Sequence, residues 1–202
     1  MVQLLIATRN RGKIVEMRAL LGAAFEKSVA VLSLQDLPSA PQPREDGETF
    51  SENARAKALH YARELRVLCV ADDSGLVVDV LGGKPGVLSA RYAGPDATDA
   101  GNNALLLDDL ASYARPWTAA FVCAAAAALP GRVVAEATGR VAGEIVPVPR
   151  GEGGFGYDPV FLVAGMGKTM AELETPEKNR ISHRGEAMRL LVAELRKSGV
   201  LG

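Results

Sequence analysis

Short apolar runs and segments with helical spacing follow one another along this chain. Residues 2–7 are an apolar run that ends at a polar cluster, which predicts a strand buried on both faces. Ile14, Met17 and Leu21 then recur at helical spacing, and Gly22 follows as a stop signal. The chain is therefore expected to begin with a strand, a polar loop and a helix.

A second helix is predicted after an extended loop. Residues 36–47 contain three prolines and few apolar residues, as expected for a surface loop. After it, one apolar helix face over four turns is marked by Phe50, Ala54, Ala58, Tyr61 and Leu65. Asn53 and Lys57, four residues apart, share an adjacent face of this helix.

Two strands, 67–71 and 76–81, are predicted on either side of the polar cluster DDSG, whose residues favour turns. Its acids would be costly to bury without partners. Further along, residues 118–129 and 132–141 flank the turn pair Pro130-Gly131 and predict a hairpin, although the alanine run 124–128 prefers helix by propensity.

The carboxyl-terminal half also predicts helices. Apolar spacing predicts one helix through residues 102–112 and a closing helix that is marked by Met188, Leu191 and Leu195 and stops at Gly199. Strands and helices thus interleave around a hairpin. This order favours an α/β fold with a mixed sheet, in a single domain over residues 1–202 with two lobes.

Composition and charge exclude several classes. With 48% apolar and 23% charged residues the chain is typical of a globular protein, and its net charge of −1 gives no general attraction to nucleic acid or anionic lipid. Cys69 and Cys123 lie in apolar runs and are expected to be buried thiols. The amino terminus has too few apolar residues for a secretory signal, and the apolar run 119–129 is too short for a bilayer, so we expect a cytoplasmic protein.

Four polar segments carry candidate chemistry. Residues 8–13 join a strand end to a helix start, where backbone N–H groups and the Lys13 ammonium favour phosphate. A solvated loop with Thr8 as a local cap would read the same way. Asp72 and Asp73, with the acids of residues 45–48, would repel a phosphate unless a divalent cation lay between them, and magnesium is the cation that we expect. The alternative is a solvated acidic turn.

The other two segments are GGFGYDP and EKNRISHRGEA. In the first, Phe155 or Tyr157 could stack on a flat ligand, or both rings could belong to the core. In the second, several hydrogen-bond donors precede the last helix, namely Lys178, Ser182, His183 and Arg184. His60, on the helix with Lys57, is more consistent with a surface or core role than with catalysis.

Together the segments TRNRGK, ENARAKA, ADDSGLVVDVLGGKPGVLSARYAG, GGFGYDPVF and SHRGEA make the chain resemble the inosine triphosphate pyrophosphatases, the non-standard purine nucleoside triphosphate pyrophosphatases also called HAM1-like. The resemblance runs in order from about residue 4 to residue 195, with no departure at a core motif position. It implies hydrolysis of ITP, dITP and XTP to the monophosphate and pyrophosphate, which keeps these nucleotides out of DNA and RNA. It also implies Mg²⁺, a homodimer, and a long mixed sheet in two lobes around a central active-site cleft.

The resemblance also implies roles for residues. Asp73 would bind the metal and accept a proton, with Asp72 beside it as a second catalytic acid. Glu45 would complete the metal site, with Asp46 and Glu48 as alternatives in the same loop. The substrate would be held by Thr8, Arg9, Asn10, Arg11, Gly12, Lys13, Lys57, Ser74, Phe155, Gly156, Tyr157, Asp158, Lys178, His183 and Arg184.

The implied chemistry is attack of water on the α-phosphorus, with catalysis by positioning and charge stabilisation. Donors such as His183 and Arg184 would favour the 6-oxo group of hypoxanthine and xanthine over the 6-amino group of adenine. Two alternatives are a pyrophosphatase for another set of modified nucleotides and a nucleotide-binding sensor without turnover. The second predicts a broken acidic pair, whereas Asp72 and Asp73 are both present.

Overall fold

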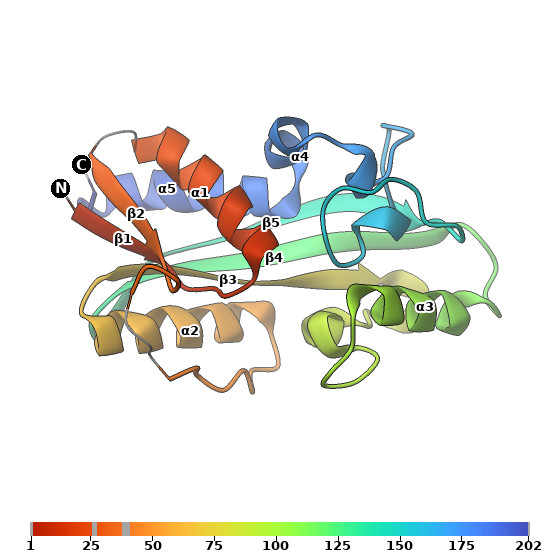
Figure 1. Cartoon of the computed structure of the whole chain (residues 1–202), viewed down its shortest axis with the longest axis horizontal. Helices are drawn as coiled ribbons and strands as arrows, with labels where there is room; N and C mark the ends of the chain where they lie inside the picture. Colours follow the sequence, from red (N-terminus) through yellow and green to blue (C-terminus); the bar gives the residue numbers. More distant parts are fainter. Residues whose placement is uncertain (1, 26–27, 38–40, 202) are drawn as a thin grey trace. The chain divides into compact units, whose positions relative to one another are not determined.

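The computed structural model describes residues 2–25, 28–37 and 41–201 of the chain. Among them six strands form one sheet, in the order β2-β1-β3-β4-β5-β6. β1 pairs in parallel with β2 and β3, whereas β5 and β6 are antiparallel, which confirms the predicted α/β class with a mixed sheet. The elements in chain order (Figure 1) are β1 (Val2–Ile6), α1 (Arg11–Phe25), β2 (Val29–Ser33), α2 (Phe50–Leu65), β3 (Leu68–Val78), η1 (Asp79–Leu81), η2 (Gly86–Arg91), α3 (Asp99–Leu110), β4 (Trp117–Leu129), β5 (Arg132–Ile145), η3 (Asp158–Val160), β6 (Phe161–Val163), η4 (Met170–Glu172), α4 (Thr175–Ile181) and α5 (His183–Lys197).

The chain forms two compact units. The first contains the described residues within 1–73, 123–139 and 183–202, and the second contains residues 74–122 and 140–182. β3, β4 and β5 therefore contribute residues to both units. The expected single domain with a cleft between two lobes stays a prediction.

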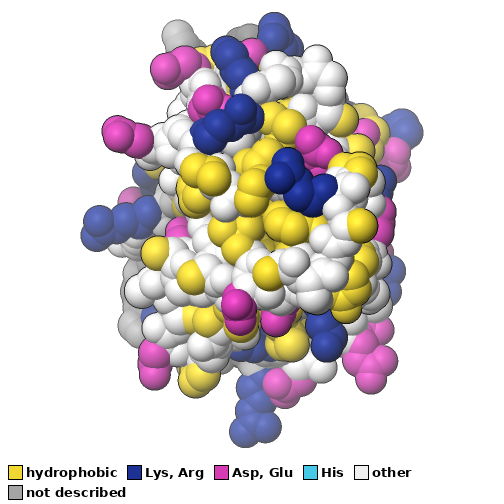
Figure 2. Space-filling view, turned by 90° about the vertical axis from the view of Figure 1, so that its right-hand side faces the viewer, with side chains coloured by type: hydrophobic (Ala, Val, Ile, Leu, Met, Phe, Trp, Pro, Cys, Tyr) yellow, Lys and Arg dark blue, Asp and Glu magenta, His cyan; other side chains and the backbone are white. Residues whose placement is uncertain are grey.

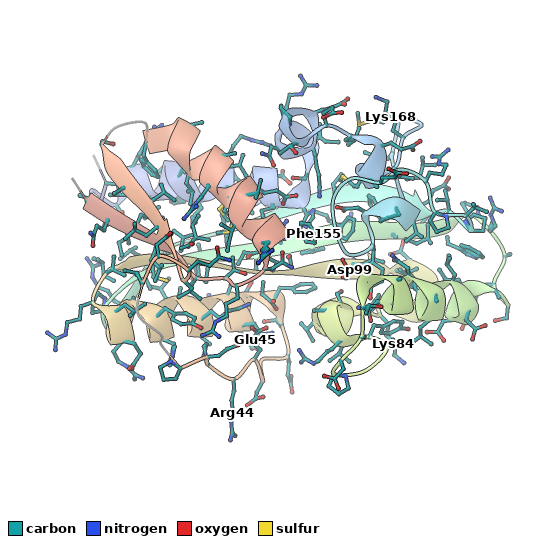
Figure 3. All side chains as sticks on the ribbon, viewed as in Figure 1. Arg44, Glu45, Lys84, Asp99, Phe155 and Lys168 are labelled. Carbon is teal, nitrogen blue, oxygen red and sulfur yellow. The ribbon has the colours of Figure 1, made fainter. Side chains whose placement is uncertain are left out.

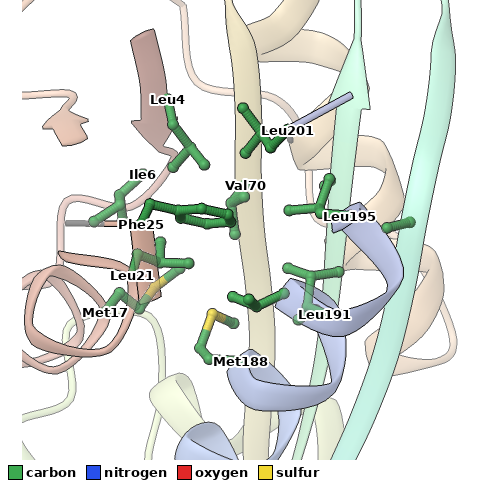
Figure 4. Packing of buried hydrophobic residues seen from close by; sticks show 14 of the residues in the cluster. Leu4, Ile6, Met17, Leu21, Phe25, Val70, Met188, Leu191, Leu195 and Leu201 are labelled. Carbon is green, nitrogen blue, oxygen red and sulfur yellow. The ribbon is translucent and has the colours of Figure 1, made fainter. Parts of the chain in front are cut away.

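The first unit buries both faces of its part of the sheet. Along β1, Leu4 and Ile6 belong to one core cluster, whereas Leu5 and the following Ala7 belong to another, as side-chain alternation in a strand requires. Helices α1 and α5 cover the first face and α2 covers the other (Figure 1). Figure 4 shows the first cluster, whose labelled side chains come from β1, β3, α1, α5 and the segment after α5.

The alanine run is part of strand β4. Ala124, Ala126 and Ala128 pack toward α2, whereas Ala125 and Ala127 pack toward α1 and α5. Burial on both faces overrides the helical propensity of alanine, because a helix here would remove one of the two middle strands of the sheet. The predicted hairpin is confirmed: β5 follows β4 after Pro130-Gly131, and Gly131 has the positive φ of 88° that the turn requires.

Two predicted breaks are wrong. Gly22 does not end the first helix, which continues to Phe25 because that side chain extends the buried face of α1. The DDSG cluster is not a turn, because β3 runs through it as a single strand from Leu68 to Val78. Asp72 and Asp73 lie inside this strand and are 1% and 8% exposed, respectively. Partners from distant segments, described below, make their burial possible.

The second unit packs a separate core. Leu106 and Leu110 of α3 meet Leu76 and Val78 of β3, together with aromatic residues of β4 and β6. The predicted helix over 102–112 is confirmed in type but begins earlier, since the Thr98 side chain accepts a hydrogen bond from the N–H of Gly101.

The remaining expectations concern the loop before α2, the cysteines and membrane spans. Residues 41–47 have no helix or strand, as predicted, whereas residues 38–40 lie outside the described residues. Cys69 and Cys123 are buried and free, and burial raises the pKa of both thiols. None of the helices formed by the described residues has the length and apolar character that crossing a membrane requires.

Candidate active site

The two adjacent acids of β3 point to opposite faces of the sheet. Successive side chains alternate along a strand, so Asp72 faces the side covered by α1 and α5, and Asp73 faces α2. Both lie within the first unit. The DDSG sequence therefore supplies one carboxylate to each of two polar networks.

Asp72 is the centre of the first network. The Lys13 ammonium lies 3.0 Å from its Oδ2 atom, and the Arg184 Nε donates to the same oxygen at 3.1 Å. Arg184 also donates from Nη1 to Oε2 of Glu16 at 2.5 Å. Burial by itself would raise the pKa of Asp72, but the charges of Lys13 and Arg184 hold that pKa well below its usual range. Asp72 is therefore ionised, and these cations hold it in place.

Asp73 belongs to the second network, with two side chains of α2. Asn53 donates from Nδ2 to Oδ2 of Asp73 at 3.0 Å, and the Lys57 ammonium lies 3.4 Å from Oδ1. Burial raises the pKa of Asp73 above its ordinary value, although Lys57 and Lys13 lower it. The pKa values of Asp72 and Asp73 are thus shifted in opposite directions, as is common for pairs of acids in active sites.

The Lys57 ammonium also joins Asp73 to the loop before α2. Its Nζ atom lies 3.3 Å from Oε1 of Glu45, which stands on that loop (Figure 3). Burial lowers the pKa of Lys57, but the charges of Asp73, Asp72 and Glu45 raise it above its ordinary value. Of the three acids in residues 45–48, Glu45 is half-buried and paired with Lys57, whereas Asp46 and Glu48 are exposed. Glu45 is therefore the acid of this loop that shares a partner with Asp73, and its binding of a metal stays a prediction.

Glu45 and Asp73 are the residues that would hold a magnesium ion. Both lie near one positive charge in the structure, that of Lys57, and hard oxygen ligands are those that Mg²⁺ prefers. Among the described residues no group of three or more His, Cys, Asp or Glu side chains could hold a metal. Magnesium bound with a nucleotide needs only one or two carboxylates, because phosphate oxygens and water complete its shell.

Asn53 is a site residue that the sequence predictions did not assign. Its Oδ1 accepts the N–H of Gly47 at 2.9 Å while its Nδ2 donates to Asp73, so one buried amide ties the acidic loop to β3. The available signal was its spacing of four residues from Lys57, which places both side chains on one helix face. A capping box of Thr49 and Glu52 starts α2 at the position that this contact requires.

Replacing Gly47 with alanine is expected to lower kcat/KM about tenfold, because the new Cβ would lie 2.7 Å from Oδ1 of Asn53 and displace that amide. Steady-state kinetics over a magnesium series would measure the loss. Gly22→Ala is the matched control: nothing lies within 4 Å of its new Cβ, and it should raise helix stability by about 1 kcal/mol with unchanged kinetics. Equal kinetics in the two variants would contradict the role of the Gly47 contact.

The predicted phosphate loop connects β1 to α1. The Asn10 side chain accepts the N–H of Lys13 at 3.1 Å, and Thr8 Oγ1 accepts the N–H of Asn10 at 3.2 Å, so both residues stabilise the helix start. Thr8 and Gly12 are half-buried, whereas Arg9, Asn10 and Arg11 are exposed. Binding of phosphate by this loop stays a prediction.

A second set of predicted residues lies in the second unit. Asp158 Oδ2 accepts the N–H of Phe155 at 2.9 Å and the Lys178 ammonium at 2.5 Å, and the Lys178 Nζ lies 4.8 Å from the centre of the Phe155 ring. Tyr157 is buried and donates its hydroxyl to the carbonyl of Ser89 at 2.8 Å, so burial raises its pKa. The half-buried Phe155, rather than Tyr157, is therefore the ring suited to stacking on a ligand.

The donors before the last helix fall into different units. Lys178 belongs to the second unit with Phe155, whereas His183 and Arg184, at the start of α5, belong to the first. Two nitrogens of Arg184 donate to the carboxylates of Asp72 and Glu16. Contact of Arg184 with a base stays a prediction. Ser74, next to Asp73 in β3, is half-buried.

Comparisons with known proteins agree with these observations. Residues 4–194 match the model of the Ham1 family. A dITP/XTP pyrophosphatase of Geobacillus kaustophilus is 52% identical over 189 residues, which are 93% of this chain and 91% of that protein. The dITP/XTP pyrophosphatase of Geobacter sulfurreducens is 49% identical and covers 99% of this chain and 100% of its own. A solved HAM1 protein of Coxiella burnetii has a TM-score of 0.86 at 38% identity, over 98% of this chain and 100% of that chain. This chain therefore belongs to the Ham1 family.

Proposed function

We propose that this protein is a dITP/XTP pyrophosphatase, which hydrolyses ITP, dITP and XTP to the nucleoside monophosphate and pyrophosphate and so keeps them out of DNA and RNA. The observation that carries the proposal is the similarity to two proteins of that name, which extends over nearly the whole chain at 52% and 49% identity. The buried acid pair, with lysines beside both carboxylates, is the chemistry that such a reaction needs. A pyrophosphatase for another nucleotide set and a sensor without turnover are less well supported.

Lys13 and Lys57, the lysines beside the two acids, compensate the charge of the triphosphate. Phe155, beside Lys178, is the ring on which the base stacks. Glu45 and Asp73 would hold Mg²⁺, which when bound neutralises phosphate charge and orients the phosphate oxygens.

Asp73 orients the attacking water. A bond forms between the water oxygen and the α-phosphorus, the bond from that phosphorus to the bridging oxygen breaks, and pyrophosphate leaves with the electron pair. The Asp73 carboxylate accepts the proton that the water gives up as this bond forms. Asn53 holds Asp73 Oδ2 and so directs the carboxylate.

Incubation with ITP, XTP, dITP, GTP, ATP and dTTP, with and without magnesium, tests the proposal when products are separated by chromatography. We expect magnesium-dependent conversion of ITP, dITP and XTP to monophosphate and pyrophosphate, with ATP and dTTP nearly unchanged. The 6-amino group of adenine would meet hydrogen-bond donors and lose about 1–3 kcal/mol for each donor left unpaired. Release of orthophosphate, or equal turnover of ATP, would contradict the proposal.

Phe155→Ala is expected to raise KM for ITP about tenfold to a hundredfold with a smaller change in kcat, because stacking contributes about 1–3 kcal/mol per base. Steady-state kinetics measures both constants. Tyr157→Phe serves as the control, since it removes only the hydroxyl that donates to Ser89. An unchanged KM in Phe155→Ala would show that another group holds the base.

A homodimer and a cytoplasmic location complete the proposal and stay predictions. Figure 2 shows hydrophobic side chains gathered in the middle of the face that it presents, bordered by charged side chains. In the second unit, Val80, Leu88, Tyr113 and Val148 are exposed. Apolar surface of this kind is often covered by another protein chain. Light scattering on the purified protein measures the mass in solution.

A further inference from the structure

Helix α3 holds the backbone of the loop that carries Phe155. The Asp99 carboxylate accepts the N–H of Gly156 at 2.7 Å, and Asn103 donates from Nδ2 to the Gly156 carbonyl at 3.0 Å. Asp99 and Asn103 are four residues apart, so both side chains come from one face of the first turns of α3. Figure 3 shows Asp99 and Phe155 on the same side of the second unit. Asp99 and Asn103 are not among the residues predicted to bind a ligand.

The loop needs such support because glycines surround Phe155. Gly154 and Gly156 adopt positive φ angles of 75° and 63°, which glycine reaches easily. Because glycine can also adopt many other conformations, these residues do not by themselves fix the shape of the loop. Ordering a flexible residue costs roughly 1–2 kcal/mol in conformational entropy. Hydrogen bonds from outside the loop are therefore needed to keep a single conformation before a ligand binds.

The bonds restrain both backbone dihedral angles of Phe155. The peptide group before its Cα is held by Asp158, which accepts the Phe155 N–H at 2.9 Å. The peptide group after it is held by Asp99, which accepts the Gly156 N–H. Since peptide groups are planar, restraining the two neighbouring planes restrains φ and ψ and thus the direction of the Cα–Cβ bond. The bond from Asn103 to the next carbonyl adds a third restraint.

We propose that Asp99 and Asn103 are positioning residues for the purine base: they orient the Phe155 ring through Gly156 without touching the substrate. This rests on the proposed role of Phe155 in base binding. A ring that is already oriented lets the base stack without first ordering the loop, so the pair strengthens binding rather than the chemical step.

The test compares Asp99→Ala, Asn103→Ala and Asp99→Asn by ITP kinetics and by calorimetric titration with IMP, which reports binding without turnover. We expect each alanine variant to raise KM and the IMP dissociation constant about five- to thirty-fold, with kcat within about twofold of wild type. Asp99→Asn keeps an acceptor for the Gly156 N–H and should restore both constants to within about threefold. Failure of this rescue would contradict the mechanism.

Two controls separate positioning from general stability. Ala104→Gly, at an exposed position of α3, destabilises that helix by about 1 kcal/mol without removing either bond and should leave both constants unchanged. Adding Asp99→Ala to Phe155→Ala should raise KM little further, because the ring that it positions is absent. An equal rise with and without Phe155, or an equal rise in Ala104→Gly, would overturn the proposal.

The outcome is distinguishable from failure of the proposed function. If the wild type hydrolyses none of the nucleotides but binds IMP, and the alanine variants weaken that binding, the positioning role stands and the proposed reaction falls. If the variants bind IMP as tightly as the wild type, the positioning role falls whatever the enzyme hydrolyses. A wild type that does not bind IMP overturns the positioning role together with its premise.

Discussion

Replacing Asp73 with asparagine is expected to lower kcat for ITP about 10²–10⁴-fold while the protein stays folded. The amide has nearly the shape of the carboxylate, so Asn53 keeps an acceptor, but the variant cannot take a proton or hold a cation as a carboxylate does. Product chromatography and circular dichroism measure the two effects.

Folding should survive because Asp73 is buried at a cost. Its pKa is raised in the folded protein, so the ionised carboxylate lowers the stability of the folded state at pH values above the unfolded pKa. This unfavourable contribution grows as the pH rises above the unfolded pKa. A neutral side chain removes it, and the free energy of unfolding at pH 7 should stay constant or rise. Loss of stability for function is common at active sites.

Asp36→Asn is the matched control for this prediction. Asp36 belongs to the same unit as Asp73 and pairs with Arg18. Its side chain is partly exposed, and Asp36 lies outside β3. Its loss should leave kcat unchanged. A kcat for Asp73→Asn within about threefold of the wild type would remove Asp73 from the reaction.

Replacing Arg184 with methionine is expected to reduce the free energy of unfolding by about 3–5 kcal/mol, since breaking one side of a buried ion pair leaves charge uncompensated. Arg184 is 1% exposed and donates to both Asp72 and Glu16. The variant retains the Lys13 contact with Asp72 but deprives Glu16 of this guanidinium. Urea unfolding followed by circular dichroism measures the change.

Arg196→Met, on the same helix, is the control. Arg196 is exposed and donates to the carbonyl of Ala24, so its loss should cost less than about 1 kcal/mol. An Arg184→Met variant as stable as Arg196→Met would contradict the buried-network interpretation.

The acid dependence offers a second readout of the same network. The pKa of Asp72 is lowered in the folded state, so its contribution to stability is present above the unfolded value, near pH 4, and is lost as the pH falls below it. Removing Arg184 reduces the lowering of that pKa. Between about pH 4 and pH 2, the free energy of unfolding should therefore fall by fewer kcal/mol in the variant than in the wild type.

Local patterns in the sequence predicted several elements correctly. The apolar face of residues 50–65, the hairpin around Pro130-Gly131 and the closing helix each depend on neighbours within a few turns or across a tight turn. The same patterns failed at DDSG and Gly22 because each decision there depended on distant packing. The polar sequence DDSG favours a turn by its local composition. It forms a strand because Asp72 pairs with Lys13 and Arg184, which lie 59 and 112 residues away in the chain.

The sequence by itself determined the fold class, the family resemblance and the residue types that the site needs: two adjacent acids, lysines near them, and an aromatic ring in a glycine-rich loop. Only the tertiary structure decided that Asp72 and Asp73 serve separate networks, that Asn53 links the acidic loop to β3, and that α3 holds the loop of Phe155. The physical reason is that these relations depend on which elements flank a strand or a loop in space. That arrangement follows from sheet order and packing, which no local spacing of residues records.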